Sequence, residues 1–188
     1  DAEQYRFITR LGNLDDALKG IEAALSAGLF PVKLNTVVVR SLNQDLLSFA
    51  RLTVDAPLHV RFIEYMPIGS GEDCGGCGWG PADVVPAKEI IETISAQAQS
   101  IGLGSLQPAI ATPDGWGPAQ YNRLPGAQGT VGVISAISNH FCASCNRLRL
   151  TADGKIKPCL FSDTEYDIRS ALRKGSEEEV LSVFKAAL

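Results

Sequence analysis

The chain has 188 residues, of which 45% are hydrophobic and 20% charged, and its net charge is −4. These proportions exclude a disordered chain, and the negative charge argues against a general nucleic-acid-binding surface. No apolar run reaches the roughly 20 residues of a membrane span, and no secretory signal opens the sequence. The five cysteines cannot all pair within one chain, and their CxxC spacings favour metal ligation in a reducing compartment. We therefore expect a cytoplasmic protein with no membrane or nucleic-acid partner.

The first half of the sequence has the pattern of alternating helices and strands. Leu14, Ala17 and Leu18 begin a run with the spacing of one helix face. The run PVKLNTVVV is rich in β-branched residues, as is typical of a buried strand. In chain order the patterns predict a helix between Asn13 and Gly28, a strand over 31–39, a helix over 44–52 capped by Asn43, and a strand over 59–65. A strand, a helix and a strand joined by short links indicate a βαβ unit and a parallel sheet.

The second half begins with a long irregular loop, 67–86, that is rich in glycine. A helix is predicted from Pro86 onward, because isoleucines recur on one side of it. The patterns that follow predict strands over 119–124 and 129–137, which we assign to a second, smaller unit. A hairpin is predicted next, with strands over 147–151 and 155–161 around the turn Asp153-Gly154. Helices are predicted over 166–174 and 177–188, and the second begins with the capping box Ser176-x-x-Glu179.

Three cysteines gather around the predicted hairpin. Cys142 and Cys145 precede its first strand at CxxC spacing, and Cys159 lies on its return strand. The hairpin can therefore bring three thiolates to one metal centre. Two kinds of centre remain open: a structural zinc site completed by His140 or Cys77, and an iron–sulfur cluster with one iron free of protein ligands.

The other two cysteines, Cys74 and Cys77, lie in the glycine-rich loop. They could form a second metal half-site or a redox pair, or be incidental to a variable loop, and we favour the last interpretation. His59 and His140 are single histidines, which are more often structural than catalytic. Of the two, only His140 lies near the hairpin cysteines.

Two pairs of basic residues are candidates for binding an anion. Arg147 and Arg149 are two residues apart on a predicted strand, so both would project from one face near the cysteines. Guanidinium groups suit a phosphate or a purine carbonyl, and the alternative is a solvated hairpin face. Lys33 and Arg61 each interrupt an apolar strand, where a cation needs an anion or a cavity. Two interpretations remain open: the cations could bind phosphates inside a barrel, or each could form an ion pair with a carboxylate such as Glu64 or Asp55.

With these residues assembled, the sequence resembles the GTP 3′,8-cyclase family, which are radical S-adenosylmethionine enzymes of molybdenum cofactor biosynthesis. The matching segments run over nearly the whole chain: PVKLNTVVVR, VRFIEYMPIG, FCASCNRLRLTADGKIKPCLF and DIRSALRKG. The resemblance implies an α/β fold, the C-terminal part of an incomplete (β/α)6 TIM-like barrel followed by an α+β extension that carries an iron–sulfur cluster. On this basis we expect the barrel part, with its loop 67–86, over 1–99, and the cluster- and GTP-binding extension over 100–188.

The resemblance also implies roles for individual residues. Cys142, Cys145 and Cys159 match the three ligands of a [4Fe–4S] cluster whose free iron contacts the GTP purine. The other matching positions are Arg147, Leu148, Arg149, Lys33 and Arg61 for GTP, and Met66 for S-adenosylmethionine.

The implied activity converts GTP to (8S)-3′,8-cyclo-7,8-dihydroguanosine 5′-triphosphate. S-adenosylmethionine is cleaved reductively, hydrogen is taken from the ribose C3′, and C3′ then attacks the purine C8. The implied partners are GTP, S-adenosylmethionine, a second copy of the chain in a homodimer, and the next enzyme of the pathway, which receives the product.

The sequence departs from the family in two respects that matter. The C-terminal double-glycine tail of the family is not among these 188 residues. The CxxxCxxC motif that would hold a second [4Fe–4S] cluster is not among these 188 residues. We therefore expect part of a longer enzyme, inactive alone and prone to self-association through unpaired strand edges. The alternatives are another radical enzyme with an auxiliary cluster, and a non-catalytic zinc-binding module with Cys74, Cys77, Cys142 and Cys145 as ligands.

Overall fold

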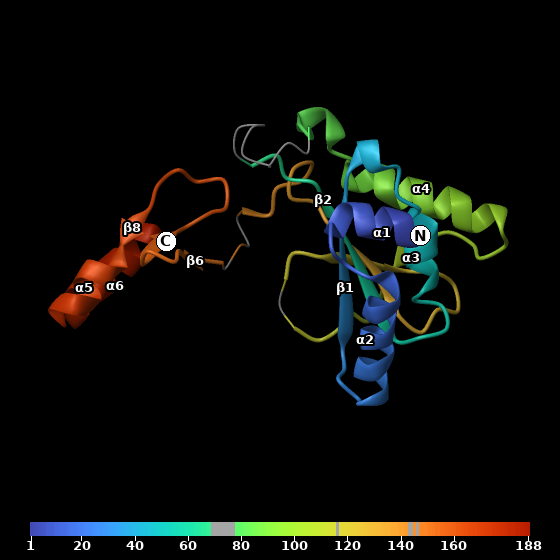
Figure 1. Cartoon of the computed structure of the whole chain (residues 1–188), viewed down its shortest axis with the longest axis horizontal. Helices are drawn as coiled ribbons and strands as arrows, with labels where there is room; N and C mark the ends of the chain where they lie inside the picture. The colour runs from blue at the N-terminus through green and yellow to red at the C-terminus, as the bar shows by residue number, and fades with distance from the viewer. Residues whose placement is uncertain (69–77, 116, 143–144, 146) are drawn as a thin grey trace. The chain divides into compact units, whose positions relative to one another are not determined.

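The computed structural model describes residues 1–68, 78–115, 117–142, 145 and 147–188 (Figure 1). The chain forms two compact units. Asp1–Met66 and Trp79–His140 make up the first, and Phe141–Leu188 makes up most of the second. Cys74 and Cys77 lie outside the described residues, so their role stays a prediction.

The first unit holds the elements predicted for the first half of the chain and several more. Its helices are α1 (Ala2–Thr9), α2 (Leu14–Ser26), α3 (Leu46–Arg51) and α4 (Ala87–Ser100), its short 3-10 helices are η1 (Arg40–Leu42) and η2 (Pro81–Asp83), and its strands are β1 (Val32–Val38), β2 (Leu58–Glu64), β3 (Gln107–Pro108), β4 (Gln120–Arg123) and β5 (Thr130–Ile134). The helix α1 was not predicted. The cap of α3 was also predicted wrongly, because the side chain that accepts a hydrogen bond from its first turn belongs to Asp45. Asn43 instead ends η1 in a left-handed conformation.

The strands of this unit form one mixed sheet in the order β1-β2-β5-β4-β3. The strands β1, β2 and β5 are parallel, whereas β4 and β3 are antiparallel additions. The sequence prediction that β4 and β5 belong to a second, smaller unit is wrong. Every residue of β5 is buried, as befits a strand in the interior of a sheet, and β5 lies between β2 and β4. The α/β class is confirmed, and the barrel and the functional boundary near residue 100 stay predictions.

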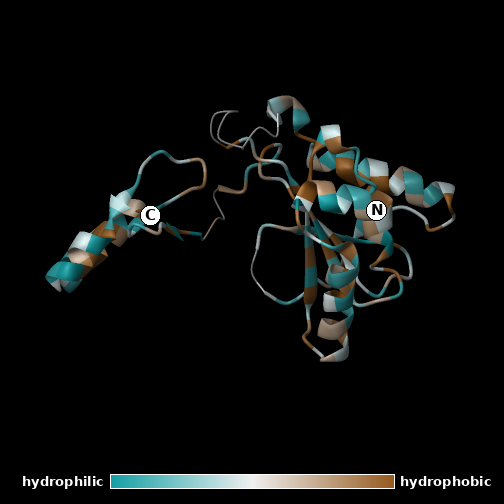
Figure 2. Ribbon diagram, in the orientation of Figure 1, coloured by the Kyte–Doolittle hydropathy of each residue, from teal (hydrophilic) through white to brown (hydrophobic). Residues whose placement is uncertain are grey.

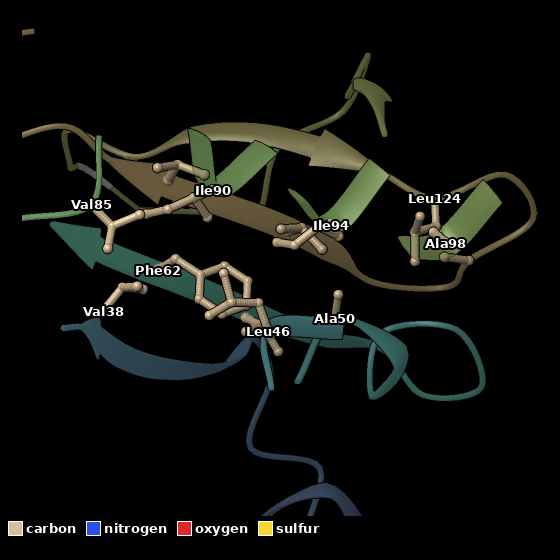
Figure 3. Packing of buried hydrophobic residues seen from close by; sticks show 13 residues of the cluster. Val38, Leu46, Ala50, Phe62, Val85, Ile90, Ile94, Ala98 and Leu124 are labelled. Carbon is tan, nitrogen blue, oxygen red and sulfur yellow. The ribbon is translucent and has the colours of Figure 1, made fainter. Parts of the chain in front are cut away.

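The main hydrophobic core lies between one face of this sheet and the helices α3 and α4 (Figure 3). Phe62 of β2 is fully buried, and Ile90 and Ile94 of α4 point toward the sheet. The helix α4 is banded with hydrophobic and hydrophilic residues in Figure 2, as expected for a helix with one apolar side. Burial of a side chain of this size contributes about 1.5–3 kcal/mol. This packing holds β1, β2 and β5 in register, and their other face carries polar residues at one end and Val37, Ile63 and Ile134 at the other.

The second unit holds a three-stranded sheet and two helices. Its elements are β6 (Arg149–Leu150), β7 (Lys155–Lys157), β8 (Tyr166–Asp167), α5 (Ile168–Lys174) and α6 (Glu177–Ala187). The predicted hairpin is confirmed, with shorter strands, and Gly154 in its turn has a φ of 83°, a conformation that favours glycine. Ser176 caps α6 as predicted, accepting a hydrogen bond from the Glu179 amide. Among the described residues, no helix is both long enough and apolar enough to cross a membrane.

Candidate functional site

The second face of the sheet carries polar and cationic side chains from three parallel strands. Burial alternates along β2, so that residues facing the core are buried and those between them are half-buried. The register pairs Lys33 with His59 and His59 with Thr130, and it pairs Asn35 with Arg61. These five residues define what we call the polar face. Lys33 and Arg61 are diagonal neighbours on it, roughly 8 Å apart at the backbone by strand geometry.

The two predicted cations, Lys33 and Arg61, have neutral partners on this face. The Lys33 ammonium donates to the backbone carbonyl of Asp114, and Nε of Arg61 donates to Oδ1 of Asn35 at 2.8 Å. Within the described part of the chain, no salt bridge joins either cation to a carboxylate. The alternative of a structural ion pair with Glu64 is therefore not what the structure shows. Both cations retain hydrogen-bond donors that could meet an anion.

His59 lies between these cations and is held by a neighbouring strand. Its Nδ1 is 2.8 Å from the hydroxyl oxygen of Thr130, a residue with no exposed surface. Burial lowers the pKa of His59, and surrounding cations lower it further, namely Lys33, Arg123 and Arg61. The imidazole is therefore held neutral at neutral pH in the absence of an anion.

A glycine makes room for Arg61 on the neighbouring strand. A Cβ atom at Gly132 would stand 2.9 Å from Cε1 of Tyr121 and 3.2 Å from Cγ of Arg61. The contact with Tyr121 is too short to occur without movement, and the contact with Arg61 is unusually tight. The Tyr121 ring and the Arg61 stem therefore occupy the space that a side chain would fill. Gly132 thereby allows Tyr121 of β4 and Arg61 of β2 to pack over β5 from its two sides.

Glu64 has a structural role instead of pairing with Arg61. Its carboxylate has no exposed surface. It accepts hydrogen bonds from the amides of Ala87 at 2.6 Å, Ile137 at 2.7 Å and Ser138 at 2.8 Å, and from the Ser138 hydroxyl. Burial would raise the pKa of Glu64, but these hydrogen bonds outweigh it and hold the pKa below its usual value. Through these hydrogen bonds Glu64 connects the start of α4 with Ile137 and Ser138, which precede Cys142 in the chain.

Met66, the predicted S-adenosylmethionine contact, lies two residues after the end of β2 and is half-buried. Its position after the carboxyl end of a parallel strand is where ligand sites of such sheets usually lie. No ligand contact is described for it, and its role stays a prediction.

The three hairpin cysteines are exposed free thiols. A backbone hydrogen bond joins two of them, since the Cys145 amide donates to the Cys142 carbonyl at 3.1 Å. The Phe161 amide donates to Sγ of Cys159 at 3.4 Å. An N–H···S bond of this kind suits a thiolate ligand. The donor set therefore fits an iron–sulfur cluster in its chemistry. Among the described residues, however, no three His, Cys, Asp or Glu side chains are gathered closely enough to hold a metal ion, so the ligand assignment stays a prediction.

Basic residues surround this cysteine segment, though not as the sequence predicted. Arg147 precedes the strand, which begins at Arg149, so the shared strand face expected for the pair is absent. Arg147 lies over the ring of Phe141, with Cζ 5.9 Å from the ring centroid. Arg149 stands directly opposite Lys157 on β7, a like-charge pair that destabilises a hairpin unless an anion lies nearby. Leu148 between the arginines is exposed.

Sequence reasoning missed several residues of the polar face. His59 could have been placed there, because it is two residues before Arg61 on the same strand. Thr130 and Gly132 could not, because their strand becomes the neighbour of β2 only through long-range pairing.

The comparison with known families agrees with this combination of sheet and cysteine segment. Residues 58–188 match the family model of Molybdenum Cofactor Synthesis C. The chain therefore belongs to the Molybdenum Cofactor Synthesis C family.

Individual relatives are more specific. The chain is 51% identical to a GTP 3′,8-cyclase of Pelotomaculum thermopropionicum over 176 residues, which are 93% of this chain and 51% of that protein. It is 48% identical to the GTP 3′,8-cyclases of Heliobacterium modesticaldum and Moorella thermoacetica, with 99% of this chain and 54% of each relative covered. The chain thus spans about half the length of the curated relatives it matches.

Proposed function

We propose that this chain supplies the substrate-binding part of a GTP 3′,8-cyclase of molybdenum cofactor biosynthesis. The observation that carries the proposal is the polar face of the sheet. Lys33 and Arg61 project from it without a carboxylate partner among the described residues, in a chain whose relatives are named for GTP chemistry. Two cations so placed on neighbouring strands suit the phosphate groups of a nucleotide.

The residues that would bind GTP fall into two sets. Lys33 and Arg61 neutralise phosphate charge, and Asn35 orients the guanidinium of Arg61 by its hydrogen bond. Arg147, Leu148 and Arg149 would contact the purine, whose carbonyl oxygen can accept hydrogen bonds from a guanidinium.

Cys142, Cys145 and Cys159 would hold a [4Fe–4S] cluster. Two hydrogen bonds support this, one from the Cys145 amide to the Cys142 carbonyl and one from the Phe161 amide to Sγ of Cys159. When bound, such a cluster supplies an iron without a protein ligand that a substrate heteroatom can occupy. The radical chemistry of S-adenosylmethionine, with Met66 as one contact, depends on a CxxxCxxC segment that these 188 residues do not include.

Metal content tests the proposal against the zinc alternative. After anaerobic reconstitution, we expect a brown protein that absorbs near ~400 nm and contains iron and sulfide. Cys142→Ala, Cys145→Ala and Cys159→Ala should each lose the cluster, whereas the matched variants Cys74→Ala and Cys77→Ala should keep it. A colourless protein that binds zinc, or loss of iron in Cys74→Ala equal to that in Cys142→Ala, would refute the assignment.

A further inference from the structure

The polar face holds one titratable group that the proposed function does not use. His59 sits in register with Lys33 on β1 and with Thr130 on β5, and it is two residues from Arg61 on its own strand. We propose that the His59 imidazole is a further phosphate-binding group on this face, and that phosphate binding is coupled to its protonation. This inference rests on the proposed function, since it concerns the phosphates of the same nucleotide.

The hydrogen bond to Thr130 fixes how the imidazole is presented. Nδ1 of His59 is engaged with the Thr130 hydroxyl at 2.8 Å, so Nε2 is the nitrogen left for a ligand. A hydroxyl can donate to a neutral Nδ1 or, after rotation, accept from a protonated one. Thr130 can therefore hold the ring in one orientation in both protonation states, and in both states Nε2 can carry a proton to donate.

The charges around His59 explain why the coupling should arise. Among the residues that the structure describes, the charged groups that lower its pKa are three cations: Lys33 from β1, Arg123 from β4 and Arg61 from β2. Two neutral groups lie on the same face. One is the Thr130 hydroxyl of β5, and the other is the backbone carbonyl of Asp114, which accepts a hydrogen bond from Lys33. These cations and burial hold the pKa of His59 below its usual value. A bound polyphosphate offsets the cations, so the pKa rises and a proton is taken up with the ligand.

The sign of the effect follows directly. The relevant pH range lies between the His59 pKa in the free chain and its higher pKa in the complex. Within that range ligand binding adds a proton to His59, so the affinity increases as the pH falls. The contribution of a single group is at most about tenfold in affinity per pH unit inside that window. Removal of the imidazole should remove this contribution and leave only the titration of the phosphates themselves.

The experiment compares wild-type and variant chains by calorimetric titration with GTP and with inorganic tripolyphosphate, from pH 6 to pH 8 at fixed salt. Titration at one pH in two buffers of different ionisation enthalpy gives the protons taken up. We expect His59→Gln to bind more weakly at pH 6, to show a flatter pH profile, and to take up fewer protons than wild type. Lys88→Gln removes an exposed cation on α4 and should match wild type. Thr130→Val keeps the imidazole without its anchor and should give an intermediate profile, which also covers the case of a misfolded His59→Gln.

The outcomes separate this inference from the proposed function. If wild type binds neither ligand, both fail. The proposed function is supported if wild type binds both ligands and Lys33→Ala lowers the affinity for them. If His59→Gln and Thr130→Val then follow the wild-type pH profile with equal proton uptake, only the role of His59 is overturned.

Discussion

The replacement Glu64→Gln tests how a buried carboxylate holds the start of α4 to Ile137 and Ser138. The Glu64 carboxylate has no exposed surface and accepts four hydrogen bonds, two at each oxygen. Glutamine has nearly the same volume but replaces one acceptor oxygen with a donor amide. In the best rotamer the remaining oxygen serves Ile137 and Ser138, and the Ser138 hydroxyl turns to accept from the amide. The Ala87 amide is then left facing a donor.

The cost follows from that one orphaned group. A buried donor without a partner costs about 1–3 kcal/mol, and the lost charge weakens the remaining bonds. We therefore expect the free energy of unfolding to fall by about 2–4 kcal/mol. Glu64→Ala would orphan three amides at once, at about 3–9 kcal/mol, which approaches the whole stability of a typical domain. For that reason glutamine is the informative change.

Urea unfolding at pH 7 measures the effect, with Glu92→Gln as the matched control. Glu92 lies on α4 in an exposed pair with Lys88, and its replacement should change stability by less than about 0.5 kcal/mol. The wild-type advantage over Glu64→Gln should persist above the usual glutamate pKa of about 4.3 and be lost as the pH falls through the lower pKa of folded Glu64. Equal stability of Glu64→Gln and wild type at pH 7 would refute this role for the carboxylate.

Two further predictions concern Arg61 and the radical chemistry. Gly132→Val should lower the free energy of unfolding by on the order of 1–3 kcal/mol and weaken GTP binding, because the valine side chain must displace the Tyr121 ring and the Arg61 stem. A variant with wild-type stability and affinity would contradict this packing. The reduced, reconstituted chain should release no 5′-deoxyadenosine from S-adenosylmethionine, since it contains no CxxxCxxC segment; detection of that product by liquid chromatography would show the assignment of the radical source to be wrong.

Local sequence patterns predicted the elements well where neighbours in sequence decide the structure. The helix between Asn13 and Gly28, the strands β1 and β2, and the hairpin at Gly154 all depend on residues a few positions apart. The two cations on the polar face could be singled out because a charge within an apolar strand is visible in one dimension.

The pairing of strands that lie far apart in the sequence determines the features that local patterns could not predict. The placement of β5 beside β2 joins Thr130 to His59 and Gly132 to Arg61, and no local pattern encodes that choice. The pairing of Arg147 and Arg149 on one strand face failed for a different reason. The hairpin strand is shorter than its alternating pattern suggested, so Arg147 turns to Phe141 instead of continuing the ladder.

Calorimetric titration of GTP into the cluster-loaded chain tests most directly whether the chain binds GTP through its two sets of basic residues. We expect wild type to bind, and Lys33→Ala, Arg147→Ala and Arg149→Ala each to lose about ten- to a hundredfold in affinity with iron content unchanged. Arginine-to-lysine changes should restore affinity only in part, because an ammonium lacks the planar fork of a guanidinium. A wild-type chain that does not bind GTP, or three alanine variants with wild-type affinity, would contradict the account.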